Sequence, residues 1–193
     1  MFFEAKNATE KKIVELEKQI QDSQEKLYAL HRERESQNVN NYSFSSREGK
    51  ISLTDLFGPH QELILIHNMG TTCPYCTLWA DGINGMIKHF ESRAALVVCS
   101  DDSVETQSQF AVSRGWKFKM ISAADSTFTK DMNFIHSKGY HTPGVSIFKK
   151  DLAVKLTRTT RAGFGPGDAF CSLWSFFELL PKGYNGWKPK FNY

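Results

Sequence analysis

The pattern of hydrophobic and polar positions predicts a long N-terminal helix followed by an α/β domain. From Ala8 to about Ser36 there is no glycine or proline, and apolar residues recur on a seven-residue repeat, which is typical of a helix with one narrow apolar stripe. Ser23 interrupts this stripe. The apolar positions are Ile13, Leu16, Ile20, Leu27 and Leu30. Such a stripe is expected to pack on something, and the sequence leaves two alternatives open, a second copy of the chain or the helix's own domain.

The rest of the chain alternates short apolar runs with helical patterns, as an α/β fold does. After a polar linker at 38–41, residues 42–57 predict a β-hairpin with its turn at 47–49 and a short turn of helix that Ser52 caps. Buried strands are predicted at 63–66 and 96–99, joined by a helix that runs to about Phe90 and bends at Gly82 and Gly85. Further elements are expected at 104–114 (helix, ended by Gly115), 120–122 (edge strand), 127–134 (short helix), 145–148 and 153–159 (paired strands) and 167–180 (amphipathic helix).

Two cysteines follow the first buried strand. Cys73 and Cys76 are three residues apart at the predicted start of a helix, where neighbouring side chains lie about 5–6 Å apart and two sulfurs can form a disulfide. Because unpaired N–H groups and the helix dipole favour an anion there, we predict that Cys73 is the better thiolate, with a pKa of about 3.5–7.5. Cys76 is shielded and can resolve a mixed disulfide. Pro74 suits the first helical turn, where its missing N–H costs nothing.

The cysteine pair has two other interpretations, a zinc site and a pair of inert thiols. Zinc needs about four ligands, usually with a second closely spaced pair, and Cys99 and Cys171 stand apart from each other and from any histidine pair. A CxxC pair that follows a strand and opens a helix favours redox chemistry. We expect Cys99 to be a small buried residue, with a role as third exchange partner as the alternative, and Cys171 to lie in the core.

Composition limits the class of protein. The 193 residues are 40% hydrophobic, which is enough for one sizeable core with appendages. The 24 basic and 21 acidic residues are mixed along the chain, so the net charge of +3 predicts neither nucleic-acid nor membrane binding. Neither a signal segment nor a run of about 18 apolar residues is present, and we therefore expect a cytoplasmic protein. In a reducing cytoplasm a CxxC pair is more often catalytic than structural.

A second feature is the stretch His141-Thr142-Pro143-Gly144 before a predicted strand. A proline at the entry to a strand is where a cis peptide bond occurs, and we predict that Pro143 is cis, so that the Thr142 backbone can pair with a substrate strand beside the disulfide. His67 and Asp81 flank the cysteine pair and are candidates for the proton acceptor. The alternative is that each is a polar residue closing a strand or exposed on a helix.

The order of these elements resembles the thioredoxin fold, and the motif Cys-Pro-Tyr-Cys is also the glutaredoxin-type pair. More closely, the chain resembles a bacterial thioredoxin-like family of unknown function whose members are predicted to be dithiol–disulfide oxidoreductases. The matching stretches are GKISLTDLF at 49–57, CPYC at 73–76 with WADG at 79–82, and GWKF at 115–118 with Ser122. They span most of the chain, between a charged N-terminal helix and an aromatic C-terminal tail.

This resemblance implies a thioredoxin-like α/β fold, a central mixed sheet flanked by helices, with an N-terminal β-hairpin and a long N-terminal helix. The parts are then a helical arm and linker at 1–41, a thioredoxin-like domain at 42–180 and an aromatic tail at 181–193. The resemblance implies Cys73 as nucleophile, Cys76 as resolving thiol and Pro143 as a cis-proline facing them. The expected supporting residues are Pro74, Tyr75, Thr142, Trp79, His67 and Asp81. Unlike thioredoxin itself, the sequence has no WCGPC motif and no obvious buried carboxylate on its first central strand.

The sequence therefore predicts a thiol–disulfide oxidoreductase that needs no bound cofactor or metal and acts on a disulfide-containing protein or a small thiol. A peroxiredoxin-like peroxidase is a second interpretation, suggested by the EGKISLTDL hairpin and by Thr71 and Thr72 before Cys73. That class needs a Pro-x-x-x-Thr-x-x-Cys approach, and the proline is missing here. A third interpretation is a redox-silent binding module that dimerises through its helical arm.

Overall fold

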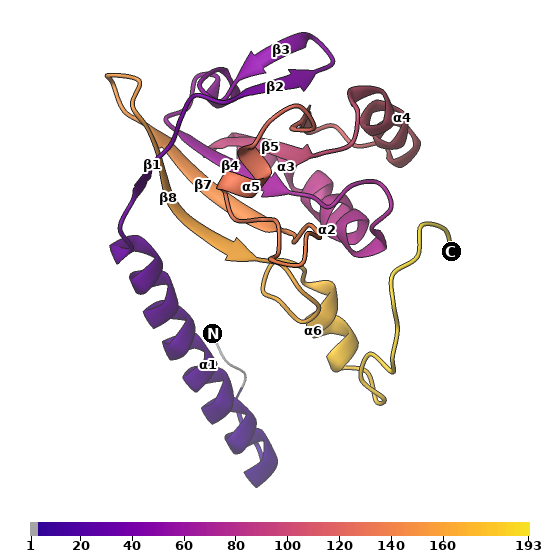
Figure 1. Cartoon of the computed structure of the whole chain (residues 1–193). Helices are drawn as coiled ribbons and strands as arrows, with labels where there is room; N and C mark the ends of the chain where they lie inside the picture. Colours follow the sequence, from indigo (N-terminus) through magenta and orange to yellow (C-terminus); the bar gives the residue numbers. More distant parts are fainter. Residues whose placement is uncertain (1–3) are drawn as a thin grey trace. The chain divides into compact units, whose positions relative to one another are not determined.

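The computed structural model describes residues 4–193, and the chain divides after Ser36 into two compact units. The first unit contains helix α1 (Ala8–Glu33), drawn in indigo in Figure 1. This helix begins where it does because the Asn7 side chain accepts the N–H of Glu10, which has no partner within the helix. The prediction of one long helix is confirmed. Asn38, the first residue of the predicted linker, instead belongs to a two-residue strand, β1 (Gln37–Asn38), which pairs with a later strand of the second unit.

The second unit is built on one mixed sheet, which has eight strands in the part of the chain that is described. Their order across the sheet is β1, β8, β7, β4, β5, β6, β2, β3. The pairs β4–β5 and β5–β6 are parallel, and the other neighbouring strands are antiparallel. Beyond β1, the strands are β2 (Ser43–Ser46), β3 (Gly49–Ser52), β4 (Glu62–His67), β5 (Ala95–Ser100), β6 (Lys119–Ser122), β7 (Gly144–Lys150) and β8 (Leu156–Gly163).

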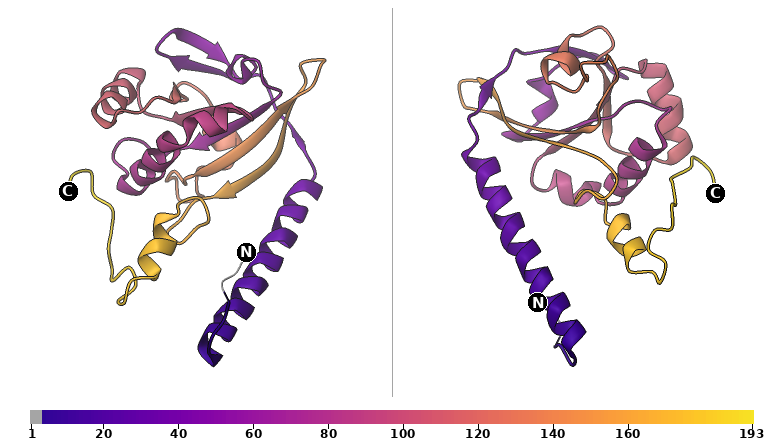
Figure 2. Two further views of the ribbon diagram at one scale, coloured as in Figure 1. Left: turned by 180° about the vertical axis from the view of Figure 1, so that it is seen from behind. Right: turned by 60° about the horizontal axis from the view of Figure 1, so that its bottom comes forward.

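Short helices connect these strands. They are η1 (Asp55–Phe57), α2 (Pro74–Gly85), α3 (Ile87–Glu91), α4 (Val104–Arg114), α5 (Phe128–Asp131) and α6 (Leu173–Glu178). The crossovers through α2 and α4 add parallel strands in one direction across the sheet, and right-handed crossovers of this kind place both helices on the same face. Figure 2 shows α2 and α4 side by side in both views. No helix within residues 4–193 is long and apolar enough to cross a membrane.

The central strands are covered on both faces, as the apolar run at 63–66 predicts. Alternate residues of a strand face opposite sides, and so Leu63 and Leu65 of β4 belong to one apolar cluster while Ile66 belongs to another. Helix α2 covers the second face with Ala80 and Ile83. The first face is packed with the rings of Phe44, Phe57, Phe128, Phe134 and Phe148. The sheet is therefore a rigid support for the loops at its edges.

Several local predictions are confirmed. The helix after the cysteine pair breaks at Met86, directly after Gly85, and continues as α3. Helix α4 has the predicted bounds and ends at Gly115, and the Ser103 side chain caps its start by accepting the N–H of Thr106. The hairpin of β2 and β3 turns between Ser46 and Gly49.

Three expectations are wrong. Strand β6 is not an edge strand, because Ser122 pairs with Ser45 and the hairpin extends the sheet beyond it. The last helix is only α6, because the Asp168 carboxylate accepts the N–H groups of Gly165 and Phe170 and holds the residues before it in a turn. The part of the chain that is described contains no cis peptide bond, so Pro143 is trans.

The trans Thr142–Pro143 bond belongs to a loop whose backbone groups are paired. Thr142 donates its N–H to the carbonyl of Phe134 at 2.8 Å, and the Pro143 carbonyl accepts the N–H of Phe164 at 2.9 Å. The trans form is preferred for an X-Pro bond by about 0.5–1 kcal/mol. With this bond trans, the Thr142 N–H and the Pro143 carbonyl both have hydrogen-bond partners. Because the next residue, Gly144, pairs with His67 at the end of β4, the loop still lies at the edge of the sheet that follows β4.

Gly144 marks a close approach of two backbones. A side chain at this position would meet the backbone carbonyl of Ala162 and, at 2.5 Å, the ring of Phe134. The neighbouring carbonyl belongs to β8 and has little freedom to move, since the two strands are paired along their length. Glycine is required at position 144 because there is no space for a side chain.

We expect Gly144→Ala to lower the free energy of unfolding by about 1–3 kcal/mol, as overpacking of a rigid site does. Gly82→Ala is the matched control, because Gly82 lies within α2 and an added methyl group there meets no atom within 4 Å. That variant should be neutral or more stable by about 0.5–1 kcal/mol. Urea denaturation of the two variants measures both values, and equal effects would contradict the steric argument.

Candidate active site

The cysteine pair lies where a loop leaves the end of β4 and enters α2. Cys73 is the N-cap of α2, and Pro74 occupies the first helical turn. The Cys73 sulfur accepts the backbone N–H of Cys76 at 3.1 Å, so the cysteine takes the place that Ser or Asp often has at a helix start. The predicted strand, loop and helix start are therefore confirmed. Both residues are buried, with Cys73 8% exposed and Cys76 3%.

The two thiols have unequal acidity. Hydrogen bonding from the Cys76 side chain, helped by the N–H groups of Cys76 and Tyr75 and opposed by burial, lowers the pKa of Cys73 to about 7. The same hydrogen bond, together with burial and the charge of Cys73, raises the pKa of Cys76. Cys73 therefore ionises far more readily than Cys76, which stays protonated as the donor. This is the order that the helix position predicts.

The loop before Cys73 is held by backbone and carboxylate contacts. Asn68 donates its N–H to the Cys99 carbonyl at 2.8 Å, and Thr71 donates its N–H to Asp102 Oδ2 at 2.7 Å. Gly70, between them, has φ +106°, and a side chain there would meet the same Asp102 carboxylate at 2.9 Å. Asp102 therefore fixes the path of the loop that presents Cys73.

A second carboxylate connects the loop that contains Pro143 to the same edge of the sheet. Asp101 accepts a hydrogen bond from Thr129 Oγ1 at 2.9 Å and pairs with His141 Nε2 at 2.7 Å. Asp101 and Asp102 were not among the candidate site residues predicted from the sequence. Their position in the sequence could have indicated them, because both directly follow β5. The carboxyl ends of parallel neighbours such as β4 and β5 meet at one edge of the sheet.

His67 does not face the cysteine pair. It is the last residue of β4 and lies on the face opposite α2, where its ring stacks on Phe134 with centroids 3.7 Å apart. Its Nε2 is bonded to Ser146 Oγ at 2.9 Å. Burial, and secondarily the charges of Arg158 and Arg161, lower its pKa well below the usual value, so the imidazole is neutral. His67 is therefore a buried residue of the core and does not contact the cysteine pair.

Asp81 also has other partners. Its carboxylate pairs with Arg114 at the end of α4 and accepts the indole N–H of Trp116 at 2.8 Å. The hydrogen bonds that the Arg114 guanidinium donates to Asp81 are the leading cause of a raised pKa at Arg114. Asp81 thereby ties α2 to the segment after α4, and the stretches WADG and GWKF of the sequence meet in one contact.

Aromatic rings surround the helix that carries the pair. Tyr75, between the two cysteines, lies 6.3 Å from the Trp79 ring and 6.2 Å from the Trp174 ring of α6, centroid to centroid. Trp79 donates its indole N–H to Asp168 at 3.3 Å. Trp174 is 8% exposed, and its indole nitrogen has no hydrogen-bond partner among the described residues.

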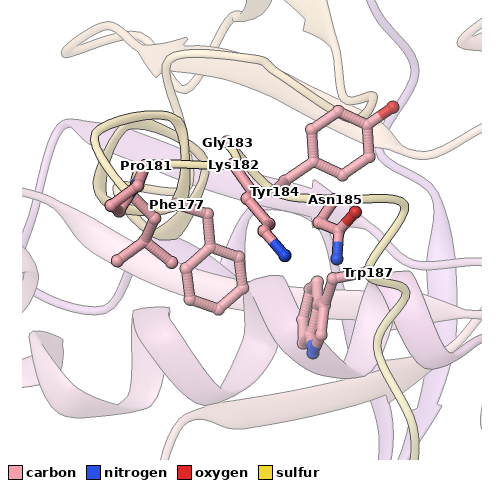
Figure 3. Close-up of a pocket in the computed structure, with 8 residues that line it drawn as sticks. Phe177, Pro181, Lys182, Gly183, Tyr184, Asn185 and Trp187 are labelled. Atoms are coloured by element: carbon pink, nitrogen blue, oxygen red, sulfur yellow. The ribbon is translucent and has the colours of Figure 1, made fainter.

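The C-terminal segment forms an open apolar pocket of about 440 Å³ next to these rings. Figure 3 shows the rings of Phe177 and Trp187 and the Lys182 side chain converging in it. Trp187 contacts Trp174 as well, so the rings continue from Tyr75 to the pocket. The residues that line it are Phe177, Leu180, Pro181, Lys182, Gly183, Tyr184, Asn185 and Trp187.

The two remaining cysteines differ from the pair. Cys99 lies opposite His67 in β5 and is 2% exposed, and burial raises the pKa of its thiol. The expectation of a small buried residue is confirmed. Cys171 is only half-buried in the turn before α6, so its predicted core position is wrong. All four cysteines are free thiols, and within residues 4–193 no three His, Cys, Asp or Glu side chains gather as metal ligands would.

Comparison with solved structures identifies the fold. A cysteine-to-serine mutant of PrxQ from Xylella fastidiosa has a TM-score of 0.57 and 18% identity, and the match covers 67% of this chain and 85% of that one. Peroxidoxin BcpB from Mycobacterium tuberculosis has a TM-score of 0.53 and 21% identity, with 66% and 84% covered. The reduced 2-Cys peroxiredoxin of Plasmodium vivax has a TM-score of 0.52 and 15% identity, with 66% and 83% covered. These similarities confirm the thioredoxin-like α/β fold.

The sequence itself has no match among curated proteins. A model of a family described as bacterial protein of unknown function, DUF899, matches residues 4–191. The match includes α1, the whole sheet and nearly all of the C-terminal segment, so the resemblance inferred from the short motifs is confirmed over almost the full chain. The chain belongs to the DUF899 family of bacterial proteins of unknown function.

Proposed function

We propose that the protein is a thiol–disulfide oxidoreductase in which Cys73 is the nucleophile and Cys76 the resolving thiol. One observation supports this assignment above the others. The backbone N–H of Cys76 and its thiol both donate to the Cys73 sulfur, which favours the thiolate and lowers the pKa of Cys73 to about 7. An inert buried thiol has no such donors, and burial alone raises its pKa, as it does at Cys99. The thioredoxin-like fold is consistent with this chemistry.

In the first step the Cys73 thiolate attacks one sulfur of a substrate disulfide. A bond forms between Cys73 Sγ and that sulfur, the substrate S–S bond breaks, and the departing thiolate takes a proton from solvent. The product is a mixed disulfide between Cys73 and half of the substrate. A disulfide-containing protein or a disulfide of a small thiol fits this step.

In the second step Cys76 loses its proton and attacks Cys73 Sγ. The mixed disulfide breaks, the second substrate thiolate leaves and is protonated, and the cysteine pair is oxidised by two electrons while the substrate becomes two thiols. Two causes of the raised pKa of Cys76 are its hydrogen bond to Cys73 and the charge of Cys73. Both disappear once Cys73 is in a mixed disulfide, so the pKa of Cys76 falls at that stage, although burial still raises it.

Cysteine variants should trap different species. In Cys76→Ser the attack by Cys73 still occurs but nothing resolves the product, so we expect a mixed disulfide with a disulfide-bonded test protein on non-reducing electrophoresis. Cys73→Ser should trap almost nothing. Cys171→Ser, which changes the half-buried thiol outside the pair, is the control and should behave as the wild type. Equal trapping by the Cys73 and Cys76 variants would refute the assigned roles.

The reactivity of Cys73 should depend on pH with a midpoint near 7. Only the thiolate is alkylated, so the rate of iodoacetamide modification should be half its maximum at a pH of about 7 and level off above that pH. Cys76→Ala removes the side-chain donor that stabilises the charged form, and its midpoint should move up towards the free-thiol value of about 8.5. Cys76→Ser keeps a hydroxyl donor and should lie between the two. Identical midpoints in all three proteins would show that this hydrogen bond does not control the pKa.

Peroxide reduction is a second candidate, because the solved structures compared above include a peroxidoxin and a reduced 2-Cys peroxiredoxin. The Cys73 thiolate would take one oxygen from a hydroperoxide, giving a sulfenic acid and an alcohol or water, and Cys76 would then form the disulfide and release water. The positions where that class has Pro and Thr are Ile66 and Gly70 here. This departure is why disulfide exchange is the first proposal.

Peroxide consumption distinguishes the two candidates. With dithiothreitol as reductant, a disulfide exchanger should consume hydrogen peroxide or cumene hydroperoxide no faster than Cys73→Ser, while reducing a protein disulfide much faster than that variant. Consumption that depends on Cys73 and exceeds the variant's by tenfold or more would favour the peroxidase instead.

A further inference from the structure

Helix α1 carries an apolar stripe that its own unit, which ends at Ser36, leaves uncovered along the helix. No residue of the helix is buried. The side chains of the stripe are between 42% and 65% exposed, although all of them are large aliphatic groups. They are Ile13, Leu16, Ile20, Leu27 and Leu30. An apolar stripe of this kind, interrupted only at Ser23, marks a surface that binds another surface.

The residue types at each position of the repeat indicate what that other surface is. With Ile13 as position a of a heptad, the a positions are Ile13, Ile20 and Leu27, and the d positions are Leu16, Ser23 and Leu30. Isoleucine at a with leucine at d is the combination that favours two parallel helices over higher assemblies. The stripe therefore fits a second copy of itself in a two-stranded coiled coil.

The polar break in the stripe indicates the direction of the partner helix. In a parallel pair in register, Ser23 faces Ser23 of the other copy, and the two hydroxyls can bond to each other. In an antiparallel pair that overlaps fully, Ser23 faces Ile20 instead, which buries a hydroxyl against an apolar side chain. Burying an unpaired hydroxyl costs about 1–3 kcal/mol in proteins. The parallel arrangement avoids this cost.

The charges beside the stripe agree with the parallel arrangement. Lys12 stands at position g and Glu17 at the following position e. In a parallel coiled coil these positions meet across the interface, so Lys12 of each copy lies beside Glu17 of the other, and the pair forms twice. The next pair of this kind is Gln19 with Gln24, which is neutral. The third pair is Lys26 with His31, which has no acidic member, so the charge complementarity rests on the first pair.

We propose that α1 forms a parallel two-stranded coiled coil with α1 of a second copy of the chain, which makes the protein a homodimer. This proposal does not depend on the redox activity. The seam consists of the a and d positions, and Ser23 sets the register. The helical arm then has one function, to hold two thioredoxin-like domains together.

A substitution in the seam tests the dimer in the full-length chain. By light scattering the wild type should have twice the chain mass of 22.0 kDa, whereas Ile20→Asp, which places charges in the seam, should have the mass of one chain. Gln21→Asp is the matched control, because Gln21 is the next residue and lies outside the seam, and it should stay dimeric. A monomeric wild type, or an Ile20→Asp variant that remains dimeric, would overturn the proposal.

A cysteine at the polar position tests the direction. In Ser23→Cys the new thiols of the two copies face each other in a parallel pair, so oxidation should give a covalent dimer on non-reducing electrophoresis. Gln21→Cys carries an extra thiol just outside the seam and should give much less. If Ser23→Cys links no better than Gln21→Cys, the parallel register is wrong. Circular dichroism of each variant verifies that the helix is still formed.

Discussion

The parallel pairing of β4 and β5 is the constraint on which the site depends. Because both strands run the same way, their carboxyl ends meet at one edge, and the loop that presents Cys73 lies beside the loop that follows β5. The contacts of Asn68 with Cys99 and of Thr71 with Asp102 both follow from this pairing. The antiparallel strand β7 adds the loop with Pro143 to the same edge, since Gly144 pairs with His67. Three segments far apart in the sequence are thus fixed next to one helix start.

The asymmetry of the cysteine pair then follows from local geometry. At a helix start the first residue receives N–H groups, and the residue one turn later provides one of them. Cys73 is therefore stabilised as an anion by Cys76, and the hydrogen bond that lowers one pKa raises the other. The spacing of three residues thus lets one contact make the two thiols unequal, which is the basis of the roles proposed for them. Neither effect needs a charged residue from elsewhere in the chain.

Local features of the fold could be predicted from the sequence, because they depend on neighbouring residues. The features predicted in this way are the strand at 63–66, the helix start at Cys73, the break after Gly85 and the full extent of α4. The predictions were wrong where contacts with residues distant in the sequence determine the local structure. The sequence pattern at 167–180 is amphipathic, but Asp168 captures backbone N–H groups and delays the helix. His67 and Asp81 stand near the cysteines in sequence, yet strand alternation turns His67 to the opposite face, and Arg114 and Trp116 engage Asp81.

The contact between Asp81, Arg114 and Trp116 has a consequence for how the family varies. Two short motifs that look independent along the chain are one physical unit, because a single carboxylate serves both a guanidinium and an indole N–H. A relative that loses the acid at position 81 would leave two donors without their acceptor, and one that loses Trp116 would leave one carboxylate oxygen with fewer partners. We therefore expect positions 81, 114 and 116 to change together among DUF899 sequences. Covariation of these positions would then reflect the contact between α2 and the end of α4.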